Sequence, residues 1–257
     1  MLNKILSLTF LMLAITIIGC STETTAAPTA PYPAPLKPPP VPPYPAPQNP
    51  PPVPPYPAPQ NPPAARPTTS PIGELARSAE SAYQSGNLDQ ALADYSKIIE
   101  LDPKNADAYY NRALIYEDKG NVEQAIVEYT RLIALDAKYV RAIYNRGILY
   151  HKQGKLDQAI TDYTKAMELD PTSPRPYNNR GLAYEDQGDP VRAFADYSKA
   201  IELNPTFAIA YLNRGALYRE QGRKAEAVAD LEKYLELDPN AADRAQIEEW
   251  LRELGGQ

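Results

Sequence analysis

Residues 106–139 read ADAYYNRALIYEDKGNVEQAIVEYTRLIALDAKY, and residues 140–173 read VRAIYNRGILYHKQGKLDQAITDYTKAMELDPTS. The two stretches have the same length and align without a gap. A fixed period of this length indicates an array of repeated structural units. A glycine recurs with the same period, as Gly86, Gly120, Gly154, Gly188 and Gly222. The array divides into units 72–105, 106–139, 140–173, 174–207 and 208–241.

Within each unit, the small and aromatic residues fall on two helical faces. When each unit is numbered from 1 to 34, positions 4, 8 and 11 share one face of a helix, and positions 20, 24 and 27 share one face of a second helix. Position 8 is always small and position 20 is always alanine, so the two backbones can approach closely. The glycine at position 15 ends the first helix, and Asn87, Asn121 or Asp189 caps the second. We therefore predict two antiparallel helices per unit.

The pattern resembles the tetratricopeptide repeat, which has aromatic residues at positions 4, 11 and 24, small residues at positions 8 and 20, and proline at position 32. The resemblance covers the whole array, 72–241. It implies an all-α fold, a right-handed superhelical solenoid of five helix pairs. Residues 242–257 carry an apolar stripe with helical spacing, which predicts a C-terminal capping helix and tail. The stripe consists of Ile247, Trp250, Leu251 and Leu254.

Charged residues also recur with the period. Position 7 is arginine in the last four units, and position 23 is acidic in all five. Charges that recur together predict a structural ion pair between helices or neighbouring units, because catalytic charges are few and unique. The residues are Arg112, Arg146, Arg180 and Arg214 at position 7, and Asp94, Glu128, Asp162, Asp196 and Asp230 at position 23.

The resemblance implies that the first helices line a concave peptide-binding face. Position 6 is asparagine in four units, and a ladder of amides can satisfy the backbone of an extended peptide, since an amide both donates and accepts hydrogen bonds. The alternative is that duplication of units copied the asparagines without any role in binding. The predicted peptide-binding residues are Asn111, Asn145, Asn179, Asn213, Arg141, Arg175, Tyr110 and Tyr144.

Composition argues against several other classes of protein. From residue 72 onward there are 23 basic and 31 acidic side chains, a net charge of about −8, which disfavours nucleic-acid binding. One cysteine and one histidine disfavour a metal centre, and no cofactor is expected. We expect His151 to be a solvated residue at the edge of the groove. The chain lacks the Gly-x-Ser-x-Gly, phosphate-loop and His-Glu-x-x-His motifs, so an enzyme is a remote alternative.

Residues 1–19 are predicted to be a signal peptide. Lys4 precedes an apolar run from Ile5 to Ile18, which is too short to span a bilayer comfortably. Gly19-Cys20 follows and resembles the bacterial lipobox, which implies cleavage before Cys20 and acylation of that cysteine. The expected product is an exported lipoprotein at the outer membrane, facing the periplasm, or at the cell surface. The alternative is an incidental cysteine in an uncleaved signal anchor.

Residues 20–71 form a proline-rich linker that holds 22 of the 29 prolines. Residues 38–49 and 50–61 both read PPPVPPYPAPQN. Because proline fixes φ and restrains the residue before it, we expect a tract without helix or sheet, extended as polyproline II. The tract is interpreted as a spacer, or alternatively as a ligand for an aromatic-lined groove.

These features predict a lipid-anchored adaptor or scaffold that binds peptide segments and organises a bacterial envelope complex. The alternative is a passive structural subunit of an envelope assembly machine, of the secretin, pilus or outer-membrane assembly type. The expected partners are a protein or peptide, and the membrane through Cys20. Nucleic acid and metal ions are not expected.

Overall fold

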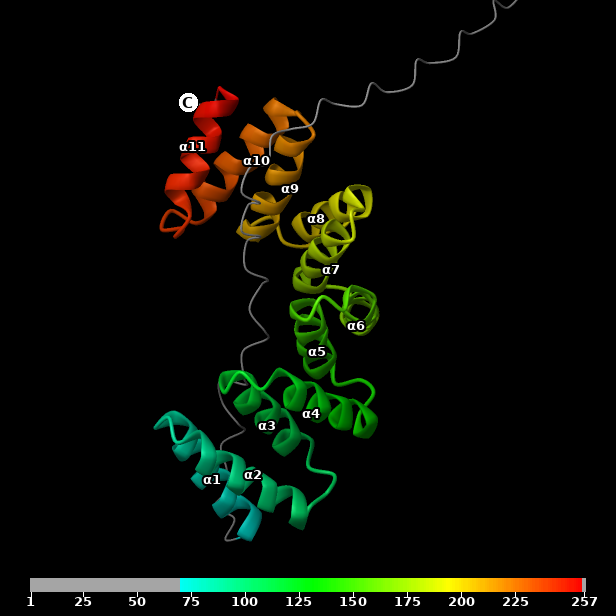
Figure 1. The fold of residues 1–257 in the computed structure, drawn as a ribbon, viewed down its shortest axis with the longest axis vertical. Helices are drawn as coiled ribbons and strands as arrows, with labels where there is room; N and C mark the ends of the chain where they lie inside the picture. The colour runs from blue at the N-terminus through cyan, green and yellow to red at the C-terminus, as the bar shows by residue number, and fades with distance from the viewer. Residues whose placement is uncertain (1–69, 256–257) are drawn as a thin grey trace, which may run out of the picture. The chain divides into compact units, whose positions relative to one another are not determined.

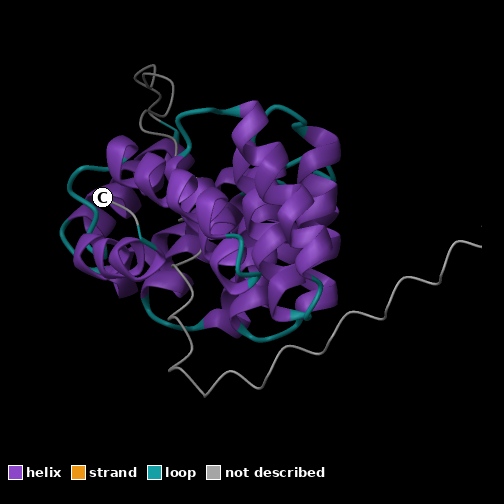
Figure 2. Cartoon of the chain, turned by 90° about the horizontal axis from the view of Figure 1, so that it is seen from above, coloured by secondary structure: helices purple, strands orange, loops and turns teal. Residues whose placement is uncertain are grey.

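The computed structural model describes residues 70–255, and this part of the chain contains eleven helices and no strand (Figures 1 and 2). Cys20, the predicted signal peptide and the proline-rich linker lie outside the described residues. The helices are α1 (Pro71–Gln84), α2 (Leu88–Leu101), α3 (Ala106–Asp118), α4 (Val122–Leu135), α5 (Val140–Lys152), α6 (Leu156–Leu169), α7 (Pro174–Asp186), α8 (Pro190–Leu203), α9 (Ala208–Glu220), α10 (Lys224–Leu237) and α11 (Arg244–Leu254).

Helices that follow one another in the chain also pack against one another. The pairs α1–α2, α3–α4, α5–α6, α7–α8 and α9–α10 form the five repeats, and each second helix also packs on the first helix of the next repeat. Helix α11 packs on α10. The all-helical repeat fold that the period of the sequence predicts is confirmed. None of the described helices is both long enough and apolar enough to cross a membrane.

The turns inside the repeats follow the glycine pattern. Gly154 has a φ of 70°, in the left-handed region that disfavours residues with a Cβ. Asn87 and Asp189 cap the following helices, since each side chain accepts a backbone N–H of the first turn. The cap predicted for Asn121 is wrong, because its side chain makes no such bond.

The two helices of a repeat meet where the small residues lie. A Cβ added to Gly181 on α7 would lie 2.6 Å from Cε1 of Tyr197 on α8, so the tyrosine ring occupies the space that a side chain would need. Tyr197 and Ala193 are fully buried. The small residues therefore admit the aromatic ring of the partner helix into the core, as the sequence predicts.

Helix α1 of the first repeat exposes polar residues on the face where the later first helices pack against a preceding repeat. Position 10 is buried and apolar in the four later repeats, whereas the first repeat carries the exposed Ser81 there. Glu74 and Arg77 on the same helix are also exposed. At the other end, Ile247 and Leu251 of α11 are buried against the last repeat. The array thus has a solvated first helix at one end and a covering helix at the other.

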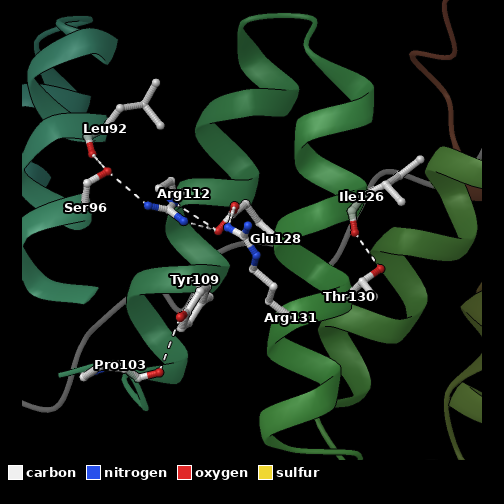
Figure 3. A network of polar contacts seen from close by, with 9 residues as sticks. All are labelled: Leu92, Ser96, Pro103, Tyr109, Arg112, Ile126, Glu128, Thr130 and Arg131. Carbon is white, nitrogen blue, oxygen red and sulfur yellow. Dashed lines mark hydrogen bonds and ion pairs between the residues drawn. The ribbon is translucent and has the colours of Figure 1, made fainter. Parts of the chain in front are cut away.

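The recurring arginines join three helices at each junction. Arg112 on α3 donates from Nε and Nη2 to Glu128 on α4, at 3.0 and 2.6 Å, and from Nη1 to Ser96 on α2, at 3.1 Å (Figure 3). The acids of this set are buried. The predicted ion pair is confirmed in all four repeats that have the arginine. The equivalent contacts are Arg146 with Asp162 and Thr130, Arg180 with Asp196 and Thr164, and Arg214 with Asp230 and Ser198.

Replacement of a core tyrosine should destabilise the array strongly. Tyr163 is fully buried, so Tyr163→Ala removes a large aromatic side chain and leaves a cavity. We expect a loss of roughly 3–5 kcal/mol in the free energy of unfolding, measured by urea denaturation. Tyr83→Ala, at a side chain that is 38% exposed, is the control and should cost clearly less. Equal losses would contradict this account of the core.

Removal of one recurring arginine should cost more than removal of a surface ion pair. Arg180→Ala leaves the buried carboxylate of Asp196 without its guanidinium, and we expect a loss of roughly 2–4 kcal/mol. Lys165→Ala breaks only the exposed pair with Glu168, which is worth about 0–1 kcal/mol. Urea denaturation of both variants gives the comparison. A loss for Arg180→Ala no larger than that for Lys165→Ala would count against the structural role of the arginine.

Candidate functional site

The asparagine ladder lies between repeats and is not open to a ligand. Asn145 and Asn179 are fully buried, and Asn213 is 2% exposed. Each amide donates to a polar group at position 5 of the preceding repeat: Asn145 to Tyr110 at 3.3 Å, Asn179 to Tyr144 at 2.9 Å, and Asn213 to Asn178 at 2.9 Å. The expectation that these three asparagines face a peptide is therefore corrected. Position 6 is enclosed by the preceding repeat, where Asn145 also donates to the hydroxyl of Tyr129 on α4 at 3.1 Å.

Asn111 differs from the other members of the ladder because its preceding repeat is different. Position 5 of the first repeat is Ala76, which has no hydroxyl or amide that could cover the next asparagine. Asn111 is accordingly partly exposed. It is the one asparagine of the predicted set that a ligand could reach on this surface.

Tyr110 and Tyr144 belong to the core and do not form an exposed apolar floor. Both are buried, and their hydroxyls accept the amides of the next repeat. Burial raises the pKa of Tyr110 to about 12, and the guanidinium of Arg141 acts in the opposite direction. The phenol is thus uncharged at neutral pH and serves as a hydrogen-bonding partner inside the array. The predicted contact of these two rings with a peptide is corrected for the same reason as the ladder.

Arg141 and Arg175, like Asn111, are predicted site residues that keep solvent contact. Each is the second residue of a first helix, α5 and α7, and each is partly exposed. They come from adjacent repeats, whose first helices contact one another. A guanidinium presents several N–H donors in a fixed plane and binds carboxylate or carbonyl oxygens well. These two arginines, with Asn111, form the surface that we call the arginine face.

A second set of contacts links the first helices near their C-terminal ends. At two junctions the residue at position 12 of one repeat contacts the residue at position 13 of the next, and we call each such pair a rung. Tyr83 donates to Asp118 at 2.6 Å, and His151 contacts Asp186 at 2.7 Å. The expectation of a solvated His151 is corrected, because its side chain is 12% exposed and packs between repeats.

Two further pairs near these helix ends have complementary charges. Burial raises the pKa of Glu117, whereas the hydrogen bond from Tyr129 and the positive charge of Lys152 lower it. Lys152 is the residue at position 13 of the next repeat. In the last repeat, Arg219 donates to Glu253 of the capping helix at 3.1 Å. The sequence contains a signal for these contacts. The partners are complementary in type, and they lie 35 residues apart for Tyr83 and Asp118 and 34 residues apart for Arg219 and Glu253. Recurrence of one residue type does not reveal this signal, because the residue types differ from one pair to the next.

Within residues 70–255, no three His, Cys, Asp or Glu side chains are grouped so that they could hold a metal ion. The polar residues of the first helices contact one another across repeats, and the arginine face presents hydrogen-bond donors on an acidic array. Such a surface is suited to the recognition of another chain.

Comparisons with known proteins agree with the repeat fold. A model described as TPR repeat matches residues 80–120, 114–154 and 149–188, and a tetratricopeptide repeat model matches residues 174–207 and 208–241. No curated protein matches the chain. Among solved structures, a MamA structure is 27% identical over 65% of this chain and 96% of its own, with a TM-score of 0.59.

Two more distant structures share the fold alone. PilF of Pseudomonas aeruginosa is 21% identical over 72% of this chain and 89% of its own, with a TM-score of 0.58. YrrB, described as a TPR protein with an unusual peptide-binding site, is 22% identical over 66% of this chain and 88% of its own, with a TM-score of 0.56. The repeat models cover more than half of the sequence, so the chain belongs to the tetratricopeptide repeat family and is a protein–protein interaction scaffold of that type.

Proposed function

We propose that the protein is an exported, lipid-anchored adaptor that binds a peptide segment of a partner protein and organises a bacterial envelope complex. The lipobox-like Gly19-Cys20 supports the anchor, and the proline-rich residues 20–71 supply a spacer between the lipid and the repeats. The family supports the role as a scaffold. The chain itself carries out no catalysis in this proposal.

The arginine face carries the proposal for peptide binding. Arg141 and Arg175 occupy equivalent sites on α5 and α7 and stay partly exposed, while the other polar residues of the predicted set, Asn111 apart, are enclosed. They place two cations close together in the sequence order of an array whose net charge is negative, so a peptide with a carboxylate or with free carbonyl oxygens would bind there. The peptide-binding site described for YrrB indicates that a solenoid of this fold can accept a peptide.

Charge reversal at the arginine face should weaken partner capture. We expect Arg141→Glu combined with Arg175→Glu to weaken partner binding by more than about thirtyfold and to lower the yield of crosslinked partners from native envelopes accordingly. Two guanidiniums that each contribute about 1–2 kcal/mol to binding of an anionic or carbonyl group together contribute about 2–4 kcal/mol. Lys165→Glu combined with Lys199→Glu is the matched control, since these exposed lysines lie on the second helices α6 and α8. Undiminished capture by the first variant, with an unchanged melting curve, would refute the arginine face as the binding site.

Replacement of the predicted acylated cysteine should release the protein from membranes. In cells fed labelled palmitate, we expect the wild type to incorporate label and Cys20→Ser to lack it. The variant should also move from the membrane fraction to the soluble fraction, or accumulate with its signal peptide uncleaved. Cys20 is the single cysteine, so no second thiol can take its place. Label retained by Cys20→Ser would contradict the lipoprotein assignment.

A further inference from the structure

The exposed side of helix α4 departs from the period of the array. In the third, fourth and fifth repeats, a glutamate at position 29 pairs with the lysine at position 26, at 2.9, 2.7 and 2.8 Å. Position 29 of the second repeat is instead Ala134, which is exposed, and position 26 is Arg131. The same helix also exposes two large apolar side chains, Val127 at 39% and Leu135 at 44%. Its surface is therefore more apolar than that of the later second helices, and its cation has no glutamate at position 29.

Three exposed residues form one ridge along α4. Glu123, Val127 and Arg131 are spaced by four residues, so they lie in a row on one side of the helix, and such rows are the ridges by which helices pack. Glu123 accepts the side-chain amide of Gln153 at 3.1 Å. Arg131 donates from Nη1 to the buried Glu128 at 2.9 Å (Figure 3), which uses one of the five N–H donors of a guanidinium, and its side chain is 56% exposed. The ridge thus presents an acid, an apolar centre and a cation.

This ridge is complementary to a second copy of itself. When two α4 helices meet antiparallel about a twofold axis at Val127, Glu123 of each copy lies opposite Arg131 of the other, because both residues are four positions from the centre. The two Val127 side chains then pack against each other on the axis. A contact of this kind uses the same patch on both copies, so it closes as a dimer and does not extend into fibres.

The other second helices each lack one part of the pattern. Position 18 is Val191 on α8 and Ala225 on α10, so neither helix has an acid there to face the cation of a second copy. On α6 the centre of the ridge is the polar Thr161, and on α2 the acid at position 18, Asp89, is bound to Lys119 at 2.6 Å. The surface that is complete for pairing with itself is therefore that of α4.

We infer that two copies of the protein associate through antiparallel contact of their α4 helices. One helix pair buries less surface than the roughly 1,200 Å² at which stable interfaces begin, so the association is weak and depends on concentration. An anchor that holds the copies on one membrane surface would raise their effective concentration. The contact belongs to a second helix, whereas the arginine face belongs to first helices, so the dimer carries two arginine faces.

A cysteine at the centre of the ridge tests the contact directly. Two full-length copies with different tags, both carrying Val127→Cys, are produced in the same cells, and a short bismaleimide is added to their envelopes. Because Val127 lies on the proposed axis, we expect capture of one tag to recover the crosslinked second tag. Thr161→Cys, at the same position of α6, is the matched control, and the unsubstituted chain measures any product that forms through Cys20. Equal yields for Val127→Cys and Thr161→Cys would overturn the inference.

Charge reversal distinguishes a second copy from a different partner protein. In the Val127→Cys background, Glu123→Arg in both copies, or Arg131→Glu in both, places like charges opposite each other, and we expect either change to lower the yield about tenfold. When one copy carries Glu123→Arg and the other carries Arg131→Glu, every facing pair is attractive again and the yield should recover. A loss without recovery in the mixed pair would indicate that another protein covers α4.

A third variant leaves the bond between Arg131 and the buried Glu128 intact. Val127→Arg changes an exposed side chain and places two like charges on the axis, and Thr161→Arg on α6 is its control. In sedimentation velocity of the purified full chain in detergent, we expect the wild type and Thr161→Arg to form dimers as the concentration rises, and Val127→Arg to stay monomeric with an unchanged melting curve. A wild type that stays monomeric, or a Val127→Arg variant that still forms dimers, would refute the contact.

Discussion

The structure of the array depends on a half-buried arginine that binds two other helices. A guanidinium has enough donors, in one plane, to bind a carboxylate with Nε and Nη2 and a hydroxyl with Nη1, as Arg180 does with Asp196 and Thr164. The carboxylate lies on the second helix of the same repeat, and the hydroxyl on the second helix of the repeat before. One side chain therefore fixes the pairing inside a repeat and the register between repeats. Because the partner of the arginine is a buried acid, removal of either charge alone leaves the other unpaired and lowers the free energy of unfolding strongly.

This constraint explains which features of the fold the sequence predicted. The glycines at position 15, the small residues at positions 8 and 20, and the paired charges at positions 7 and 23 each satisfy a need that every repeat has. Recurrence with the period of the array therefore identified them correctly. The capping helix was also predictable, since Ile247 and Leu251 have the spacing of a helix that covers one apolar face. The missing cap bond of Asn121 was not predictable in this way. Whether a side chain makes a cap bond depends on its rotamer and on local contacts, which periodicity does not describe.

The asparagines show the limit of the same method. Helical periodicity gives the angle of a residue around its helix, but it does not give the depth to which a neighbouring repeat covers that residue. Position 6 lies at the border between the packed and the open side of the first helix. The group at position 5 of the preceding repeat decides the outcome: Tyr144 accepts the amide of Asn179, whereas Ala76 leaves Asn111 partly exposed. A polar residue that recurs in every repeat can be explained by contacts between repeats alone.

This result changes where partner recognition is to be sought in the array. The packing of helices is equivalent at every junction, so the residues that maintain it in common, such as the arginines at position 7, recur. A partner has a single sequence and meets each repeat at a different place, so the residues that select it need not recur. Position 2 fits this description, since it is Asp107, Arg141, Arg175 and Ile209 in successive repeats, with the two cations together in the middle. Residues that break the period on an exposed face are thus better candidates for specificity than residues that keep it.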